Sequence, residues 1–259
     1  MIILKCNNLT KIFPVTSGYL KEKTGLVKAV DGVSLNIEKG ETFGLVGESG
    51  SGKTTLGKLI LGILKPNSGS IELATDKPQV IFQDPYNSLD PKMRVGEIVA
   101  EGLVVGRPET EDRRPKTGDR RPETAGRVEE MLDLVRLPKG SINKYPHQFS
   151  GGERQRIAIA RAVITKPEFI VCDEPVSSLD VTVQLQILKL LKEIQKNFGI
   201  TYLFISHDLR IIRYMCDKIA VMKEGRIVEE GPTKTVYSNP SAPYTKLLLS
   251  SVLFYEYSR

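Results

Sequence analysis

A glycine-rich stretch, GESGSGKTT at residues 47–55, constrains the fold of this chain more than any other segment. It follows the short apolar run TFGLVG, which predicts a buried strand, and it opens a helix that the pattern predicts over residues 53–64. Strand, glycine loop and helix in this order match G-x-x-x-x-G-K-[ST], the pattern of a phosphate-binding loop. Glycines let backbone N–H groups surround an anion, and the helix adds its positive N-terminus. We therefore expect a nucleotide-binding α/β fold.

The loop provides the first candidate site residues. Lys53 is expected to reach the β- and γ-phosphates of the nucleotide, and the Thr54 hydroxyl is expected to bind Mg²⁺. The other candidates surround the phosphates through their backbone or hydroxyl groups: Gly47, Ser49, Gly50, Ser51, Gly52 and Thr55.

Two adjacent acids end the apolar run FIVCDE, which predicts a buried parallel strand. We expect this strand beside the phosphate loop, where Asp173 can hold the hydration shell of Mg²⁺. Glu174 is placed to orient or deprotonate a water that attacks the γ-phosphate. The alternative for Glu174 is an ordinary surface acid after a strand.

A second glycine-rich turn, FSGGERQR at residues 149–156, also precedes a helix, because Ile157, Ala160 and Ile164 follow at helical spacing. Its helix N-terminus favours an anion, but no Lys-Thr pair follows it. A turn of this kind would cap a nucleotide that another loop binds.

Together with LTKIF, VIFQ, SSLD and FISH, these motifs resemble, in kind and in order, those of the ABC (ATP-binding-cassette) ATPases. The resemblance implies that two subunits share each ATP, with Ser150, Gly151, Gly152 and Glu153 of one subunit closing over the nucleotide of the other. Glu153 stands where glutamine is usual, which should alter the local field. The remaining implied roles are adenine stacking for Phe13, Mg²⁺ sensing for Gln83, a dimer-interface contact for Asp180 and γ-phosphate contact for His207.

The same resemblance implies one ABC ATPase domain over residues 1–259, an α/β P-loop NTPase. Its parts are a RecA-like parallel-sheet core, an N-terminal antiparallel β subdomain and a helical subdomain at roughly 84–165. The segments QDPYNSLDPKMRVGEIVAEGL and NPSAPYTKLLLSSV are similar to those of oligopeptide, dipeptide and nickel importer ATPases. That similarity implies ATP and Mg²⁺ as cofactors and peptides or nickel-like substrates as cargo. It also implies three partners: a second ATPase subunit, identical or not, permeases that dock at 84–103, and an extracellular substrate-binding protein.

A soluble ABC ATPase that assembles or activates another complex is the alternative function. DNA-repair members insert a very long coiled coil between the phosphate loop and the acidic strand, and the interval from Lys53 to Asp173 is too short for one. We therefore expect no nucleic-acid partner. A nucleotide kinase would leave the second glycine turn and the FISH motif unexplained.

Composition bounds the cellular setting. The 259 residues are 40% hydrophobic and 26% charged, and the net charge of +6 favours an anionic partner: a nucleotide, nucleic acid or membrane headgroups. No apolar run approaches the roughly 18 residues of a membrane span, and the N-terminus lacks a signal-peptide pattern. We expect a cytoplasmic chain, bound peripherally to the cytoplasmic face of the membrane through its permeases.

Residues 107–127 contain a tandem repeat, RPETEDR, RPKTGDR and RPETAGR. Each unit contains a proline and no apolar seam runs through them, so we expect neither a regular helix nor a coiled coil. The expectation is a solvated, disordered insertion, and the alternative is an arm that binds a partner or an anion. Beyond Ser206 the pattern predicts a helix, two strands and a final helix.

Overall fold

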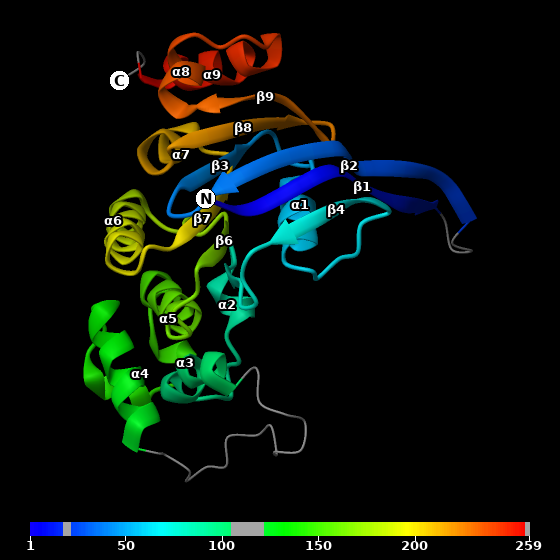
Figure 1. Ribbon diagram of the computed structural model, residues 1–259. Coiled ribbons are helices and arrows are strands. Elements are labelled where there is room, and N and C mark those ends of the chain that lie inside the picture. Colours follow the sequence, from blue (N-terminus) through cyan, green and yellow to red (C-terminus); the bar gives the residue numbers. More distant parts are fainter. Residues whose placement is uncertain (18–21, 105–121, 257–259) are drawn as a thin grey trace.

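The computed structural model describes residues 1–17, 22–104 and 122–256, which form two β-sheets with helices packed around them (Figure 1). One sheet has three strands in the order β2-β1-β4, and the other has six in the order β5-β6-β7-β3-β8-β9. The predicted α/β fold with a parallel-sheet core and an N-terminal antiparallel sheet is confirmed.

The six-stranded sheet positions the site. β3 (Thr42–Val46) is buried along its whole length, as its apolar run predicts, and it pairs in parallel with both β7 and β8. Only β9 runs antiparallel, to β8. The bounds of the other strands are β5 (Gln79–Ile81), β6 (Phe169–Asp173), β7 (Thr201–Ser206), β8 (Lys218–Lys223) and β9 (Arg226–Pro232).

One sequence-based expectation about this sheet needs correction. β6, which ends at Asp173, is not the neighbour of β3, because β7 lies between them and pairs with both. Asp173 still meets the phosphate loop, since helix α1 (Lys53–Ile60) starts from that loop and packs across both β6 and β7. The first turn of α1 therefore reaches Asp173 across β7.

The antiparallel sheet covers one face of this core. Its strands are β1 (Ile2–Ser17), β2 (Glu22–Glu38) and β4 (Ser68–Leu73), and the far end of β1 and β2 projects away from the body (Figure 1). Buried side chains of β1 and β2 pack with Leu45, Leu56 and Leu203 in one apolar cluster. Burial of this cluster fixes the antiparallel sheet and α1 against the parallel sheet.

Helices cover the other face. On α6, Ile187, Leu190, Leu191 and Ile194 are fully buried and Val183 packs against the same cluster, so their helical spacing forms one apolar face. The helical bounds are α2 (Pro85–Ser88), α3 (Val95–Val104), α4 (Pro122–Leu134), α5 (Gly151–Val163), α6 (Val181–Phe198) and α7 (Leu209–Met215), with 3₁₀ turns at Lys139–Asn143 and Pro146–Gln148.

The repeat gives a second correction. Residues 122–127 of the expected irregular insertion belong to α4, which starts at Pro122. Proline is tolerated at a helix start because the missing N–H would have no intrahelical partner there. The expectation for 107–121 lies outside the described residues.

Two smaller differences concern where one helix ends and how many helices follow β9. α1 ends at Ile60, earlier than expected, and Gly62 follows with a positive φ of 71°. The chain after β9 forms two helices, α8 (Thr233–Ser238) and α9 (Pro243–Glu256), with Pro240 between them. None of the helices in the described ranges is long and apolar enough to cross a membrane.

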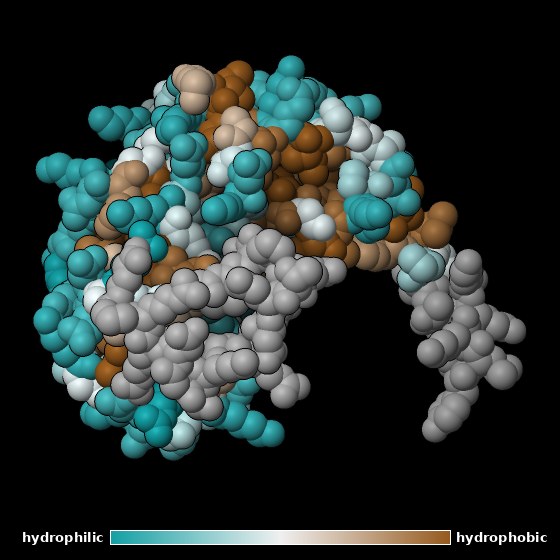
Figure 2. Space-filling view, turned by 60° about the horizontal axis from the view of Figure 1, so that its bottom comes forward, coloured by the Kyte–Doolittle hydropathy of each residue, from teal (hydrophilic) through white to brown (hydrophobic). Residues whose placement is uncertain are grey.

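Figure 2 shows the face that lies below in Figure 1. Apolar side chains gather there between the projecting end of β1 and β2 and the rest of the molecule.

Candidate functional site

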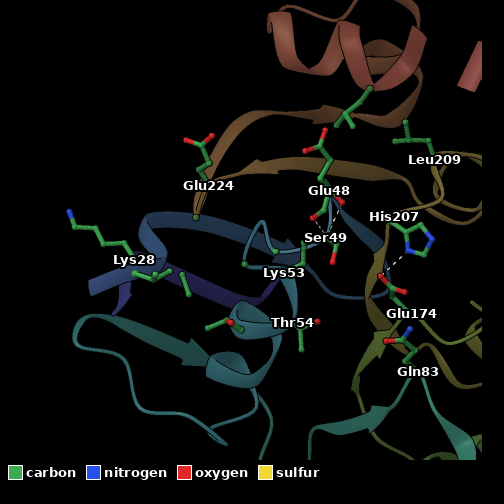
Figure 3. Close-up of a pocket in the computed structure, with 18 residues that line it drawn as sticks. Lys28, Glu48, Ser49, Lys53, Thr54, Gln83, Glu174, His207, Leu209 and Glu224 are labelled. Atoms are coloured by element: carbon green, nitrogen blue, oxygen red, sulfur yellow. Dashed lines mark hydrogen bonds and ion pairs between the residues drawn. The ribbon is translucent and has the colours of Figure 1, made fainter. Parts of the chain in front are cut away.

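A cavity of about 910 Å³ opens at the phosphate loop. The close-up shows Lys53, Thr54, Gln83, Glu174 and His207 around it (Figure 3). Of the other predicted site residues, the cavity is lined by Gly47, Ser49, Gly50, Gly52 and Thr55. Segments far apart in the sequence thus meet at one concave site of a size typical for small-molecule ligands.

The loop conformation requires glycine at two positions. A Cβ on Gly47 would lie 2.1 Å from the Met222 carbonyl oxygen, and one on Gly52 would lie 2.0 Å from that of Ala29. Gly52 also has a φ of 106°, which side chains disfavour. The neighbouring backbone therefore touches the loop directly and holds its shape.

Lys53 is folded back onto the loop. Its Nζ donates to the carbonyl oxygens of Gly47 and Glu48, each at 2.8 Å, and to Ser51 Oγ at 3.3 Å. The predicted residue Ser51 is buried and contacts the lysine instead of lining the cavity. Burial lowers the pKa of Lys53, while the carboxylates of Glu174, Asp173 and Glu48 oppose that shift. The ammonium group is thus partly desolvated, which strengthens its attraction to a phosphate.

Thr54 and Asp173 meet as predicted. Thr54 Oγ1 donates to Asp173 Oδ1 at 3.1 Å. Burial raises the pKa of Asp173, although the hydrogen bond from Thr54 opposes the shift. Hydroxyl and carboxylate oxygens, with the amide of Gln83 on the same cavity, are the hard ligands that Mg²⁺ prefers, so the residues fit that ion.

Glu174 and His207 are paired. His207 Nδ1 lies 2.9 Å from Glu174 Oε1, and both residues line the cavity (Figure 3). Glu174 has a φ of 49°, a left-handed conformation that is uncommon for glutamate. Its N–H donates to the Ile205 carbonyl and its own carbonyl accepts from Ser177 Oγ, so β7 and the SSLD turn hold it there. Strain of this kind is found at functional sites.

The second glycine turn lies elsewhere. Ser150 caps α5, and the N–H and hydroxyl of Ser150 both donate to Glu153 Oε2 at 2.8 Å. These hydrogen bonds hold the pKa of Glu153 below its ordinary value. None of Ser150, Gly151, Gly152 and Glu153 lines the cavity.

Two further predicted residues also lie outside the cavity lining. Asp180 caps α6, because its side chain accepts a hydrogen bond from the Val183 N–H at 3.0 Å. Val183 also lies against Gly152: a Cβ on Gly152 would be 2.5 Å from Val183 Cγ1. Phe13 is half-buried in β1 opposite Val27 of β2, and Val27 itself lines the cavity.

Several lining residues were not predicted from the sequence: Val27, Lys28, Ala29, Glu48, Leu209, Glu224, Gly225 and Leu248. Glu48 occupies a variable position of the loop pattern, and the others come from strands, turns and helices with no phosphate-binding motif. Only long-range pairing brings them here, for example the hydrogen bond from the Gly225 N–H to the Ser51 carbonyl.

Residues 30–177 match the family model described as ABC transporter. The chain belongs to the ABC transporter family. It therefore binds and hydrolyses ATP as an ABC ATPase, and the motif-based expectation of this family is confirmed.

Similar proteins agree with the family. The oligopeptide transport ATP-binding protein OppF of Lactococcus lactis is 45% identical over 96% of this chain and 80% of its own length. OppF of Bacillus subtilis is 47% identical over 88% of this chain and 77% of its own, and a putative peptide import ATP-binding protein of Brucella abortus is 46% identical over 96% and 76%.

Solved structures show the same fold. One component of an ABC transporter complex from Clostridium perfringens has a TM-score of 0.73 and 31% identity, covering 92% of this chain and 91% of its own. A dimeric ATP-binding cassette in a post-hydrolysis state, bound to ADP and phosphate, has a TM-score of 0.73 and 28% identity, covering 89% and 98%.

Proposed function

We propose that this ABC ATPase is the ATP-hydrolysing subunit of a peptide importer. Several of its relatives are named as oligopeptide transport or peptide import ATP-binding proteins, at 45–47% identity over most of the chain. The observation that carries the proposal is the meeting of Lys53, Thr54, Gln83, Glu174 and His207 on one cavity. We take residues 1–259 as one domain, with residues 84–165 as its helical part.

The predicted site residues at and beside the cavity have chemical tasks that their positions support. Lys53 turns from the loop carbonyls to the β- and γ-phosphates, and the N–H groups of the glycine loop and of Thr55 surround them. Glu174 orients the attacking water and accepts its proton, while His207 holds the γ-phosphate. Thr54, Asp173 and Gln83 would hold Mg²⁺, which neutralises charge on the phosphates when bound.

A second ATPase subunit completes the site. Ser150, Gly151, Gly152 and Glu153 form an anion-binding helix start, yet they lie away from the cavity of their own chain. In a dimer these residues would close over the ATP of the partner, with Asp180 at the interface. Phe13, across the strand pair from Val27, would support the adenine ring at the other end of the cavity.

Residues 84–103 are the proposed permease-docking surface. Tyr86 is 62% exposed, while Leu89, Val95, Ile98 and Val99 anchor the segment in the core. Two arginines of α5 also hold this segment. The guanidinium carbon Cζ of Arg154 lies 3.8 Å from the centroid of the Tyr86 ring, and Arg161 donates to the Ser88 carbonyl oxygen at 2.6 Å. Binding of a permease to this surface would therefore act on α5, the helix that Ser150 caps. Docking would place the chain at the cytoplasmic face of the membrane, with the extracellular binding protein as an indirect partner.

The test is the solution mass of Glu174→Gln with and without Mg-ATP. This variant should bind ATP without hydrolysing it, so a shared site predicts a shift from monomer to dimer. Lys53→Ala is the matched control and should stay monomeric. If Glu174→Gln binds ATP and remains a monomer, both alone and with its permeases, the shared site is wrong. A chain that co-purifies with a soluble complex and no permease would contradict the importer role.

A further inference from the structure

The C-terminal helix α9 reaches the phosphate loop. The Tyr244 hydroxyl accepts a hydrogen bond from the Glu48 N–H at 3.2 Å, and Leu248, one turn further along α9, lines the cavity. Both residues lie outside the segment that matches the family model, residues 30–177. The nucleotide cavity thus includes a wall from the end of the chain.

The contact falls on the residue that also binds the lysine. The Glu48 carbonyl accepts from Lys53 Nζ at 2.8 Å, and its N–H is the donor to Tyr244. Both backbone groups of Glu48 are therefore engaged. Because Tyr244 holds one side of this residue, it also helps to fix the carbonyl against which Lys53 rests.

Tyr244 is itself held in place by the six-stranded sheet. Glu229 of β9 accepts from the N–H groups of Ser241 and Ala242, at 2.7 and 3.0 Å, immediately before α9 starts. Lys223 of β8 lies 5.0 Å from the Tyr244 ring centroid, within the range of a cation–π contact. The helix start and the ring are thus anchored on two different strands.

A second tyrosine forms a hydrogen bond with the backbone of another residue that lines the cavity. Tyr237 of α8 donates its hydroxyl proton to the Leu209 carbonyl at 2.5 Å. Leu209 lines the cavity, starts α7 and follows closely after His207. Burial raises the pKa of Tyr237, which keeps its hydroxyl protonated as a donor.

We infer that Tyr244 and Tyr237 are positioning residues of the ATPase site. Tyr244 fixes the phosphate loop, and through it nucleotide binding. Tyr237 fixes the start of α7, and through it the placement of His207 for turnover. The inference rests on the proposed function, since it assumes that this cavity takes ATP.

The test compares Tyr244→Phe and Tyr237→Phe, each of which removes only a hydroxyl group. One neutral hydrogen bond contributes about 0.5–1.5 kcal/mol, which corresponds to roughly a two- to tenfold change. Tyr244→Phe should weaken ATP binding by roughly this factor with kcat retained. Tyr237→Phe should lower kcat by a similar factor with ATP affinity retained. The matched control is Tyr214→Phe, on the exposed surface of α7, where the ring lies under Lys192; it should change neither quantity.

Three measurements on the 259-residue chain decide the outcome: the Kd for ATP, kcat at saturating ATP, and Tm. A role in packing alone would lower Tm in both variants and leave both kinetic quantities at the wild-type values, and this result would overturn the inference. Equal losses of affinity and kcat in both variants would overturn it as well. The proposed function is tested separately: if the wild-type chain and Lys53→Ala bind ATP equally, the assignment of the cavity itself is wrong.

Discussion

His207 Nδ1 and Glu174 Oε1 lie 2.9 Å apart, because each residue directly follows one of two neighbouring strands, β7 and β6. The pairing places a carboxylate and an imidazole on one side of the cavity that also contains the phosphate loop. Substitution of these two residues is the most direct test of the roles proposed for them in ATP hydrolysis.

Glu174→Gln should lower turnover by roughly 10²- to 10⁴-fold while ATP still binds, because the amide cannot accept a proton. His207→Ala should also lower turnover, since the γ-phosphate loses a contact. Steady-state ATPase rates and ATP titrations measure both effects. Glu168→Gln, at the opposite end of β6 and paired with Lys39, is the control and should retain the wild-type rate. Near-normal turnover of Glu174→Gln would contradict the assignment.

Lys53→Ala should weaken ATP binding strongly, because it removes a partly desolvated ammonium group from the phosphate site. Equilibrium titration with ATP and with adenosine distinguishes the causes. Loss of a phosphate contact lowers affinity for ATP and leaves that for adenosine unchanged. Equal losses for both ligands would instead indicate a collapsed loop.

Gly52→Ala should disrupt the loop, because the new Cβ would lie 2.0 Å from the Ala29 carbonyl oxygen. Overpacking of this kind costs about 1–3 kcal/mol beyond the backbone strain. Gly40→Ala is the control, since Gly40 has a φ of 85° and a Cβ there would have no atom within 4 Å, so it shows the strain alone, about 1–2 kcal/mol. Denaturant unfolding compares the two variants. Similar losses in free energy of unfolding would show that the contact with Ala29 is unimportant.

The Ser150–Glu153 cap should make stability depend on pH. The folded-state pKa of Glu153 is held below its ordinary value of 4.5, so the stabilisation is present above that pH and is lost as pH falls through the folded pKa. Glu153→Gln can still accept from Ser150 but does not titrate. The difference in free energy of unfolding between the two proteins should therefore change over this pH window. A constant difference throughout the window would count against the carboxylate contact.

Tyr86→Ala should impair permease binding, because it removes an exposed ring from the proposed docking surface and its contact with Arg154. Co-purification with the permeases and permease-stimulated ATPase activity should both fall, while the affinity of the isolated chain for ATP is retained. Tyr214→Ala, an exposed tyrosine outside residues 84–103, is the control. If Tyr86→Ala binds the permeases as well as the control Tyr214→Ala does, the docking surface lies elsewhere.

Local patterns in the sequence determined the fold class and the residues expected to contact phosphate. The loop at residues 47–55 is readable because glycines, lysine and threonine act through the backbone and helix start on which they lie. The same holds for Ser150 and Asp180, whose side chains cap the helices that follow them.

Only the tertiary structure decided which distant groups meet. Strand order placed β7 between β3 and β6, yet α1 brought Thr54 to Asp173 across it. The hydrogen bond between Glu48 and Tyr244 joins residues 196 positions apart, and no local pattern predicts that the two residues meet. Such contacts depend on how helices and strands pack when apolar surface is buried, and that packing sums over many weak interactions that a short motif does not contain.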